Sequence, residues 1–419
     1  MKIQQLLDCI TAYYLKSGDF NGIPCYEIPS FQKEALISLI EEDLVRVLSE
    51  DDDVNTHINR LNLFATKDKQ IQTIQKSCSY VIYPTTKHLK SVNTGEAKPF
   101  TAMLAQGVEQ FRVLYFAVDV LELYTNDPRY VIWDSGYRGN IYVQADDVEN
   151  MDDLHSEYIK DFGIAYPKEP PHDRDRAIGV FLRDLSKLNY EAQCKWRGFL
   201  LRNQDEFLVN SGFIKNLLYG DWNTGYWIFD ALLDEIKLIN SMCSSIGIPN
   251  LFRKEYSRDE HELLGYRIIL IPTLKNYYEF VSALEKIVVN NLSYDAFQRN
   301  IAGIKAIERK KPDGTLKGSI EMLEDWFSLN YFSTRPENFE KFKKHISGTF
   351  RSIRKIRQTP AHELYSNKHD KQLYRKQNEL IQEVYFTLRD LRMMFSTHPY
   401  ARTVLIPEEL QHHEYLCLY

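Results

Sequence analysis

Hydrophobic residues recur every three or four positions through several long stretches of this chain, which is the spacing of one face of an α-helix. The two clearest stretches lie near the C-terminus. Their apolar positions are Phe339, Phe342, Ile346, Phe350, Ile353 and Ile356 in the first, and Leu380, Ile381, Val384, Leu388, Leu391 and Phe395 in the second. Helices with a single apolar stripe bury it against one another, so this part of the chain is predicted to be a helical bundle.

The same periodicity predicts further helices upstream, at 3–16, 31–48, 177–188, 207–219, 226–239, 276–290 and 319–329. Residues 44–48 fit a strand equally well. Branched and aromatic residues separated by turn residues are typical of antiparallel strands, and they dominate 110–124, 129–133 and 140–144. We therefore predict an α+β fold that is mostly helical and contains an antiparallel meander.

With 419 residues the chain exceeds the size of one ordinary hydrophobic core, so two or three domains are expected. The proline-rich segment 166–172 is typical of a boundary. We predict a mixed α+β domain at 1–165 that holds the meander and acts as a sensor, a helical middle region at 174–300, and the C-terminal bundle at 319–400.

Charge is distributed unevenly along the chain. Residues 335–402 contain 15 Lys and Arg against 7 Asp and Glu, a net charge of +8, whereas the whole chain has −6 and the remainder therefore −14. A basic segment attached to an acidic body is expected where one end binds a polyanion such as RNA. A basic helix face that is merely solvated is the open alternative.

The six cysteines are scattered without the spacing of a zinc site or a disulfide framework, so neither a metal nor a cofactor is predicted. No apolar run is long enough to cross a bilayer, and the first residues lack the apolar core of a signal peptide. We expect a soluble cytoplasmic protein that does not engage a membrane.

The segment RSIRKIRQTPAH at 351–362 combines a dense positive charge with a histidine. Proline usually ends or kinks a helix, so Pro360 predicts that Arg357 lies in the last turn of a basic helix and that His362 follows just beyond a break. The guanidinium of arginine matches phosphate oxygens, and histidine transfers protons near neutral pH. Arg357 and His362 are therefore the candidate catalytic pair.

This R-x4-H pattern has Pro-Ala before the histidine and lies between two amphipathic helices near the C-terminus. Over roughly residues 320–398 it resembles HEPN ribonucleases, and the layout resembles prokaryotic antiphage, abortive-infection or toxin proteins. The resemblance implies a metal-independent endoribonuclease that cuts RNA to a 2′,3′-cyclic phosphate. It also implies a homodimer through the C-terminal bundle. Because a large acidic body precedes a small basic effector, we add the hypothesis that residues 1–300 sense a trigger, such as a phage product or a partner protein, and hold the catalytic pair misaligned until then.

Three further residues are candidates for substrate contact, namely Arg354, Gln358 and Asn367. Asn367 fits a helix cap equally well. The alternative function is a non-catalytic HEPN-like module for dimerisation or for binding RNA or a nucleotide, acting as a sensor or scaffold, because a short motif occurs by chance in many proteins.

Overall fold

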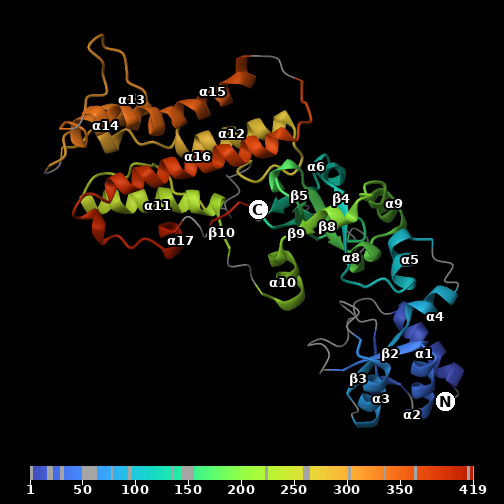
Figure 1. The fold of residues 1–419 in the computed structure, drawn as a ribbon. Coiled ribbons are helices and arrows are strands. Elements are labelled where there is room, and N and C mark those ends of the chain that lie inside the picture. Colours follow the sequence, from blue (N-terminus) through green and yellow to red (C-terminus); the bar gives the residue numbers. More distant parts are fainter. Residues whose placement is uncertain are drawn as a thin grey trace. The chain divides into compact units, whose positions relative to one another are not determined.

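The computed structural model of this chain divides into two compact units (Figure 1). The first comprises residues 1–165 and 177–213, and the second comprises 166–176 and 214–419. The structure describes residues 3–16, 22–28, 33–49, 64–76, 79–92, 97–134, 136–143, 155–221, 225–257, 265–300, 303–334, 336–362, 366–412 and 416–418, without the side chains of 359–362.

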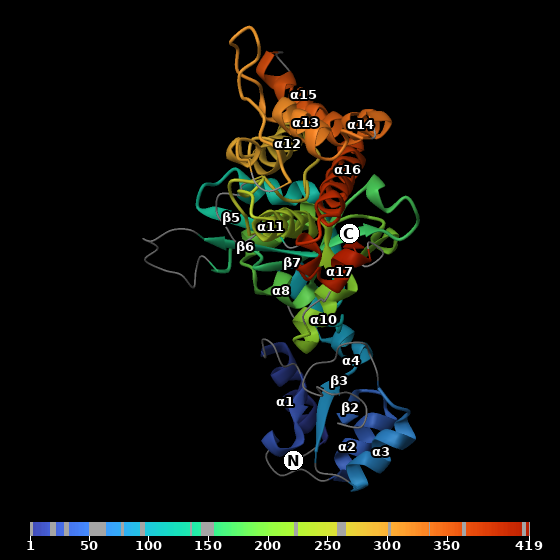
Figure 2. The same cartoon turned by 90° about the vertical axis from the view of Figure 1, so that its left-hand side faces the viewer.

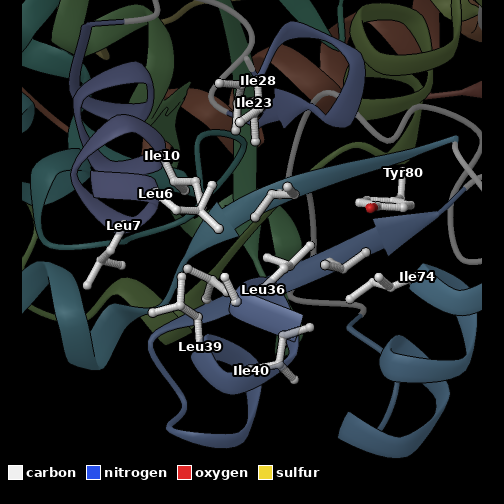
Figure 3. Packing of buried hydrophobic residues seen from close by; sticks show 14 residues of the cluster. Leu6, Leu7, Ile10, Ile23, Ile28, Leu36, Leu39, Ile40, Ile74 and Tyr80 are labelled. Atoms are coloured by element: carbon white, nitrogen blue, oxygen red, sulfur yellow. The ribbon is translucent and has the colours of Figure 1, made fainter. Parts of the chain in front are cut away.

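The first unit begins with a small three-stranded antiparallel sheet of order β1-β3-β2 covered by helices. Apolar residues of α1, α2, α3 and the sheet form its core, in which Leu6, Ile10 and Leu36 are fully buried (Figure 3). The elements here are α1 (Ile3–Lys16), β1 (Ile23–Pro24), α2 (Lys33–Glu41), β2 (Val45–Ser49), α3 (Lys67–Lys76), β3 (Tyr80–Pro84) and α4 (Thr86–Ser91). The next helix, α5 (Pro99–Ala105), packs on helices of the larger sheet that follows.

A six-stranded sheet forms the rest of this unit. Its strands run in the order β4-β8-β7-β6-β5, every neighbouring pair on that path is antiparallel, and β9 joins β7. The elements are β4 (Val113–Ala117), α6 (Glu122–Thr125), β5 (Tyr130–Asp134), β6 (Arg138–Val143), β7 (Asp161–Pro167), β8 (Ala177–Phe181), α8 (Leu182–Lys187), α9 (Tyr190–Gly198), β9 (Phe207–Val209) and α10 (Ser211–Tyr219).

Several of the sequence predictions for this sheet are wrong. The helix predicted at 207–219 begins as strand β9, and the strand predicted at 110–124 becomes helical from Val118 onward. The antiparallel meander exists, but it consists of β5, β6, β7 and β8, and β4 lies at the far edge beyond β8. The predicted helix at 177–188 begins as strand β8, in which all five residues are buried. A strand buried on both faces is apolar throughout, so helical spacing appears in it by coincidence.

Helices dominate the second unit, as the sequence predicts. They are α11 (Ile228–Ile246), α12 (Leu274–Val288), α13 (Ser319–Asn330), α14 (Pro336–Phe342), α15 (Gly348–His362), α16 (Gln372–Phe395) and α17 (Glu408–Gln411), with a π-helical turn at Lys343–Ser347. The two-residue strands β10 (Tyr226–Trp227) and β11 (Leu416–Cys417) pair in parallel. None of the helices in the described parts of the chain is both long and apolar enough to cross a membrane.

Helix α16 lies between α11 and the pair α12 and α15 (Figure 1). The interface of α11 and α16 contains a buried ion pair in which the Nε and Nη2 atoms of Arg392 donate to the carboxylate of Glu235 at 2.5 and 3.1 Å. Both side chains are almost fully inaccessible to solvent. The buried carboxylate and guanidinium satisfy each other's hydrogen-bonding groups, so removing either one would leave a buried charge without its partner.

Residues 166–176 leave the first unit between β7 and β8 and pack within the helical unit. The ammonium of Lys371 lies 2.6 Å from the carboxylate of Asp175. The guanidinium of Arg176 lies 4.5 Å from the ring centre of Tyr374, and it also donates to the backbone carbonyl of Ile269. The first turns of α16 are therefore tied to a segment that precedes them by about 200 residues.

Candidate functional site

The basic stretch identified in the sequence forms helix α15, which packs on α12 (Figure 2). The helix continues through Pro360 to His362, so the predicted break before His362 is wrong. Proline already has a helical φ angle, so the backbone stays helical through Pro360 although the hydrogen bond to the carbonyl of Ile356 is lost. Arg357 therefore lies more than a turn before the end of the helix.

A continuous helix determines how the positions of the candidate pair are related. Residues 357 and 362 are five apart, which separates their backbone positions by about 140° around the helix axis and about 7.5 Å along it. The two positions thus belong to different faces of α15. The side chain of His362 lies outside what the structure describes.

A buried carboxylate on the neighbouring helix holds two of the arginines. The carboxylate belongs to Glu285 on α12. Its Oε1 atom lies 3.6 Å from Nε of Arg354, and its Oε2 atom lies 3.4 Å from Nε of Arg357. The Glu285 side chain is only 8% exposed, whereas that of Arg357 is 47% exposed. One inward-facing carboxylate therefore anchors two guanidinium groups whose outer surfaces remain open to solvent.

Arg351 has a carboxylate partner of its own. Its Nη1 and Nη2 atoms donate to the two oxygens of Glu324 on α13, both at 2.7 Å. These hydrogen bonds raise the pKa of Arg351 above its ordinary value. Since the guanidinium is held in a bidentate geometry, its direction at the surface is well defined.

Gln358, Arg354 and two further α15 residues line an open pocket of about 350 Å³. The opposite wall is the beginning of α13, and the lining residues are Gly318, Ile320, Glu321, Arg351, Arg354, Lys355 and Gln358. Arg354 also donates to Oγ of Ser319 at 3.3 Å. The structure thus brings two of the predicted substrate residues, Arg354 and Gln358, to one pocket, while Arg357 lies outside its lining.

Asn367 is placed elsewhere, at the beginning of α12. Its Oδ1 accepts a hydrogen bond from the backbone N–H of Lys275 at 2.9 Å, and the carbonyl of Lys368 accepts one from Leu274 at 3.1 Å. Thr273 caps the third N–H of the helix, that of Asn276. This contact matches the capping role that the sequence left open for Asn367.

Replacing Asn367 by alanine is expected to lower the free energy of unfolding by about 1 kcal/mol, because the N–H of Lys275 loses its acceptor. Urea denaturation of the purified protein would measure this change. Lys368→Ala is the matched control, since that residue contributes its backbone carbonyl and its side chain is exposed. Unchanged stability of Asn367→Ala together with a raised KM for RNA would instead assign Asn367 to substrate binding.

The sequence analysis missed Glu285 and Glu324, the two carboxylates that hold the arginines. A signal for Glu285 exists in the chain. It occupies the apolar face of α12 together with Val281, Leu284 and Val288, which are buried. A carboxylate at such a position needs a cationic partner, because an unpaired buried charge is costly. No comparable signal marks Glu324, since it lies on a mixed face of α13.

The site can bind and orient phosphate groups through fixed guanidinium groups. Within the described part of the chain, no group of three or more His, Cys, Asp or Glu side chains is arranged to hold a metal ion. Comparison of the chain with family models, with curated proteins and with solved structures finds no match.

Proposed function

We propose that this chain is a metal-independent endoribonuclease that uses Arg357 and His362 in a site composed of two copies of the chain. The observation that supports the proposal most is the anchoring of Arg357 on Glu285, which leaves the guanidinium half exposed on a basic helix. A cation held in place before the substrate arrives stabilises a developing negative charge without the cost of reorganisation. Sequence resemblance to HEPN ribonucleases supports the same assignment.

In the proposed reaction, His362 removes the proton from a ribose 2′-hydroxyl, and the resulting oxygen attacks the adjacent phosphorus. Arg357 stabilises the additional negative charge on the phosphate oxygens. The bond from phosphorus to the 5′-oxygen breaks, and that oxygen takes a proton from the histidine of the second copy. The products are a 2′,3′-cyclic phosphate and a 5′-hydroxyl end.

Cleavage needs a base, a cation that stabilises charge and an acid, and a single Arg–His pair is thin for all three, so two copies are proposed to share these tasks. Residues 357 and 362 lie about 140° apart around one continuous helix. In a homodimer through the C-terminal bundle, two α15 helices would supply two arginines and two histidines to one cleft. We further propose that the enzyme serves prokaryotic antiphage defence, and that a phage-derived trigger or partner protein releases its activity.

Incubating the purified protein with 5′-labelled RNA in EDTA tests the proposal. We expect cleavage that leaves 2′,3′-cyclic phosphate ends, and we expect His362→Ala to abolish it. Since the proposed enzyme is held inactive until triggered, the assay is run on the protein alone and with lysate from phage-infected cells. Absence of EDTA-resistant, His362-dependent cleavage under both conditions would overturn the proposal.

A second candidate function is an RNA-binding module that does not cleave. It is favoured by the carboxylate partners of the arginines, because Glu285 partly offsets the charge of Arg354 and Arg357. Such a module would bind labelled RNA with an affinity that falls with added salt, leave the RNA intact, and be indifferent to His362→Ala.

A further inference from the structure

The pocket lies between α15 and the beginning of α13, and Arg357 is not among its lining residues. Along the helix axis, Arg354 precedes His362 by about 12 Å and Gln358 precedes it by about 6 Å. A phosphate held in the pocket would therefore neighbour the one that His362 acts on. The pocket lies where a strand of nucleic acid running along the helix would place another phosphate.

The α15 wall of the pocket is cationic. Arg351, Arg354 and Lys355 line it, together with the neutral amide of Gln358. Arg354 is held by contacts of 3.3 Å or more, to Ser319, Asn290 and Glu285. These contacts place the guanidinium at the pocket, and 32% of the Arg354 side chain remains exposed to solvent.

One carboxylate, that of Glu321, also lines the pocket. Lys311 offsets its charge through an ion pair of 2.9 Å. Lys311 belongs to a tight hairpin in which its N–H donates to the carbonyl of Thr315, and this hairpin leads directly into α13. Glu324 pairs with Arg351 and Glu285 with Arg354, so the four cations of α15 and the hairpin face three carboxylates, an excess of one positive charge.

The α13 wall adds backbone donors. Gly318 is the residue before α13, and no side chain caps the helix there. The pocket lies at the N-terminus of this 12-residue helix, and the first backbone N–H groups point in that direction. The helix dipole favours an anion at this end. The pocket thus combines three cationic side chains from one helix with uncapped N–H groups from another.

We infer that this pocket binds a backbone phosphate of the RNA strand close to the scissile one. The inference rests on the proposed function for the identity of the ligand. A phosphodiester carries one negative charge and two free oxygens, which suits both a fork of arginine donors and a helix terminus. The pocket would then hold the strand in register while Arg357 and His362 act on a neighbouring linkage.

Gly318 offers a direct test, because a Cβ atom added there meets no atom within 4 Å. Its φ of −73° and ψ of 162° suit any residue at a helix N-cap. Gly318→Asp and Gly318→Asn introduce side chains of equal size that both cap α13, so both withdraw the same backbone N–H from the pocket. Only the aspartate places a negative charge at the pocket, so the two variants differ in electrostatics and not in shape.

The experiment uses the full chain carrying His362→Ala, so that RNA stays intact, and measures binding of a fluorescent single-stranded oligoribonucleotide by anisotropy in EDTA. We expect the Asp variant to bind at least tenfold more weakly than the Asn variant. The slope of log affinity against log salt should fall by about 0.7 in the Asp variant, the value for one lost phosphate contact. Neither variant should denature earlier than the parent.

Equal affinity of the two variants, or no RNA binding by the parent, would overturn the inference. Inorganic phosphate at millimolar concentration should compete more strongly with RNA in the Asn variant than in the Asp variant; competition that is equal in both would also overturn it. Cleavage is assayed separately with His362 intact. If only the Asp variant loses RNA binding and no protein cleaves RNA, phosphate binding in the pocket is supported and the nuclease proposal is rejected. If the Asp variant cleaves RNA as well as the parent does, the nuclease proposal is supported and phosphate binding in the pocket is rejected.

Discussion

Replacing Arg392 by methionine is expected to lower the free energy of unfolding by about 3–5 kcal/mol. The substitution leaves the carboxylate of Glu235 inaccessible to solvent and without its hydrogen-bonding partner at the interface of α11 and α16. Burial already raises the pKa of Glu235 above its ordinary value despite the nearby arginine, so the loss of that arginine raises it further. Urea denaturation followed by circular dichroism would measure the change.

The double variant Glu235→Leu with Arg392→Met is the control. Removing both charges and filling the space with apolar groups is expected to bring stability back to the parent value or above it. A loss below about 1 kcal/mol for Arg392→Met alone would contradict the expectation. It would mean that Arg389, whose charge also favours the ionised form of Glu235, replaces the missing partner.

Replacing Arg357 by alanine is expected to lower kcat/KM for RNA cleavage by at least 100-fold, the usual cost of removing one donor that stabilises transition-state charge. Stability should change little, because Arg354 remains beside Glu285. Arg357→Lys keeps the charge but loses the planar fork, so we expect an intermediate rate. Cleavage that survives Arg357→Ala at the parental rate would remove Arg357 from the reaction.

Mixing the two inactive variants distinguishes a composite site from two separate ones. Arg357→Ala and His362→Ala proteins, unfolded together and refolded, would form mixed dimers with one arginine and one histidine in a shared cleft. We expect a partial return of activity in the mixture but not in either protein alone. A mixture as inactive as its components would show that one arginine and one histidine from different chains do not suffice, so that either both histidines or a complete pair in one chain is needed.

Helical periodicity was a reliable guide where a helix has one apolar face. The stripes that predict helices at 3–16, 276–290 and 319–329 correspond to α1, α12 and α13 within one or two residues at most ends. Residues 44–48, which fit a strand as well as a helix, lie in or beside β2 (Val45–Ser49). In each of these helices the spacing of buried side chains is set by local geometry alone, so the sequence carries the information.

Sheet topology depends on contacts that the sequence does not reveal. Strand β4 pairs with β8, which follows about 60 residues later, and not with the next strand along the chain. Nothing in residues 110–124 specifies that partner. The site shows the same limit, because the motif identifies Arg357 and Arg354 but not the carboxylate beneath them. Glu285 comes from a helix about 70 residues earlier and is brought there by the packing of α12 on α15.

The excursion of residues 166–176 has a consequence for how this architecture can change over time. The chain passes between its two units after residues 165, 176 and 213. A single crossover between genes cannot exchange either unit intact, since one fragment of the helical unit would stay behind with Asp175 and Arg176. The same holds for truncation: a clone that begins at residue 300 would expose the surface of Tyr374 and Lys371. We therefore expect the two units to be inherited together. Transfer of the basic C-terminal bundle to another protein would have to include residues 166–176 as well.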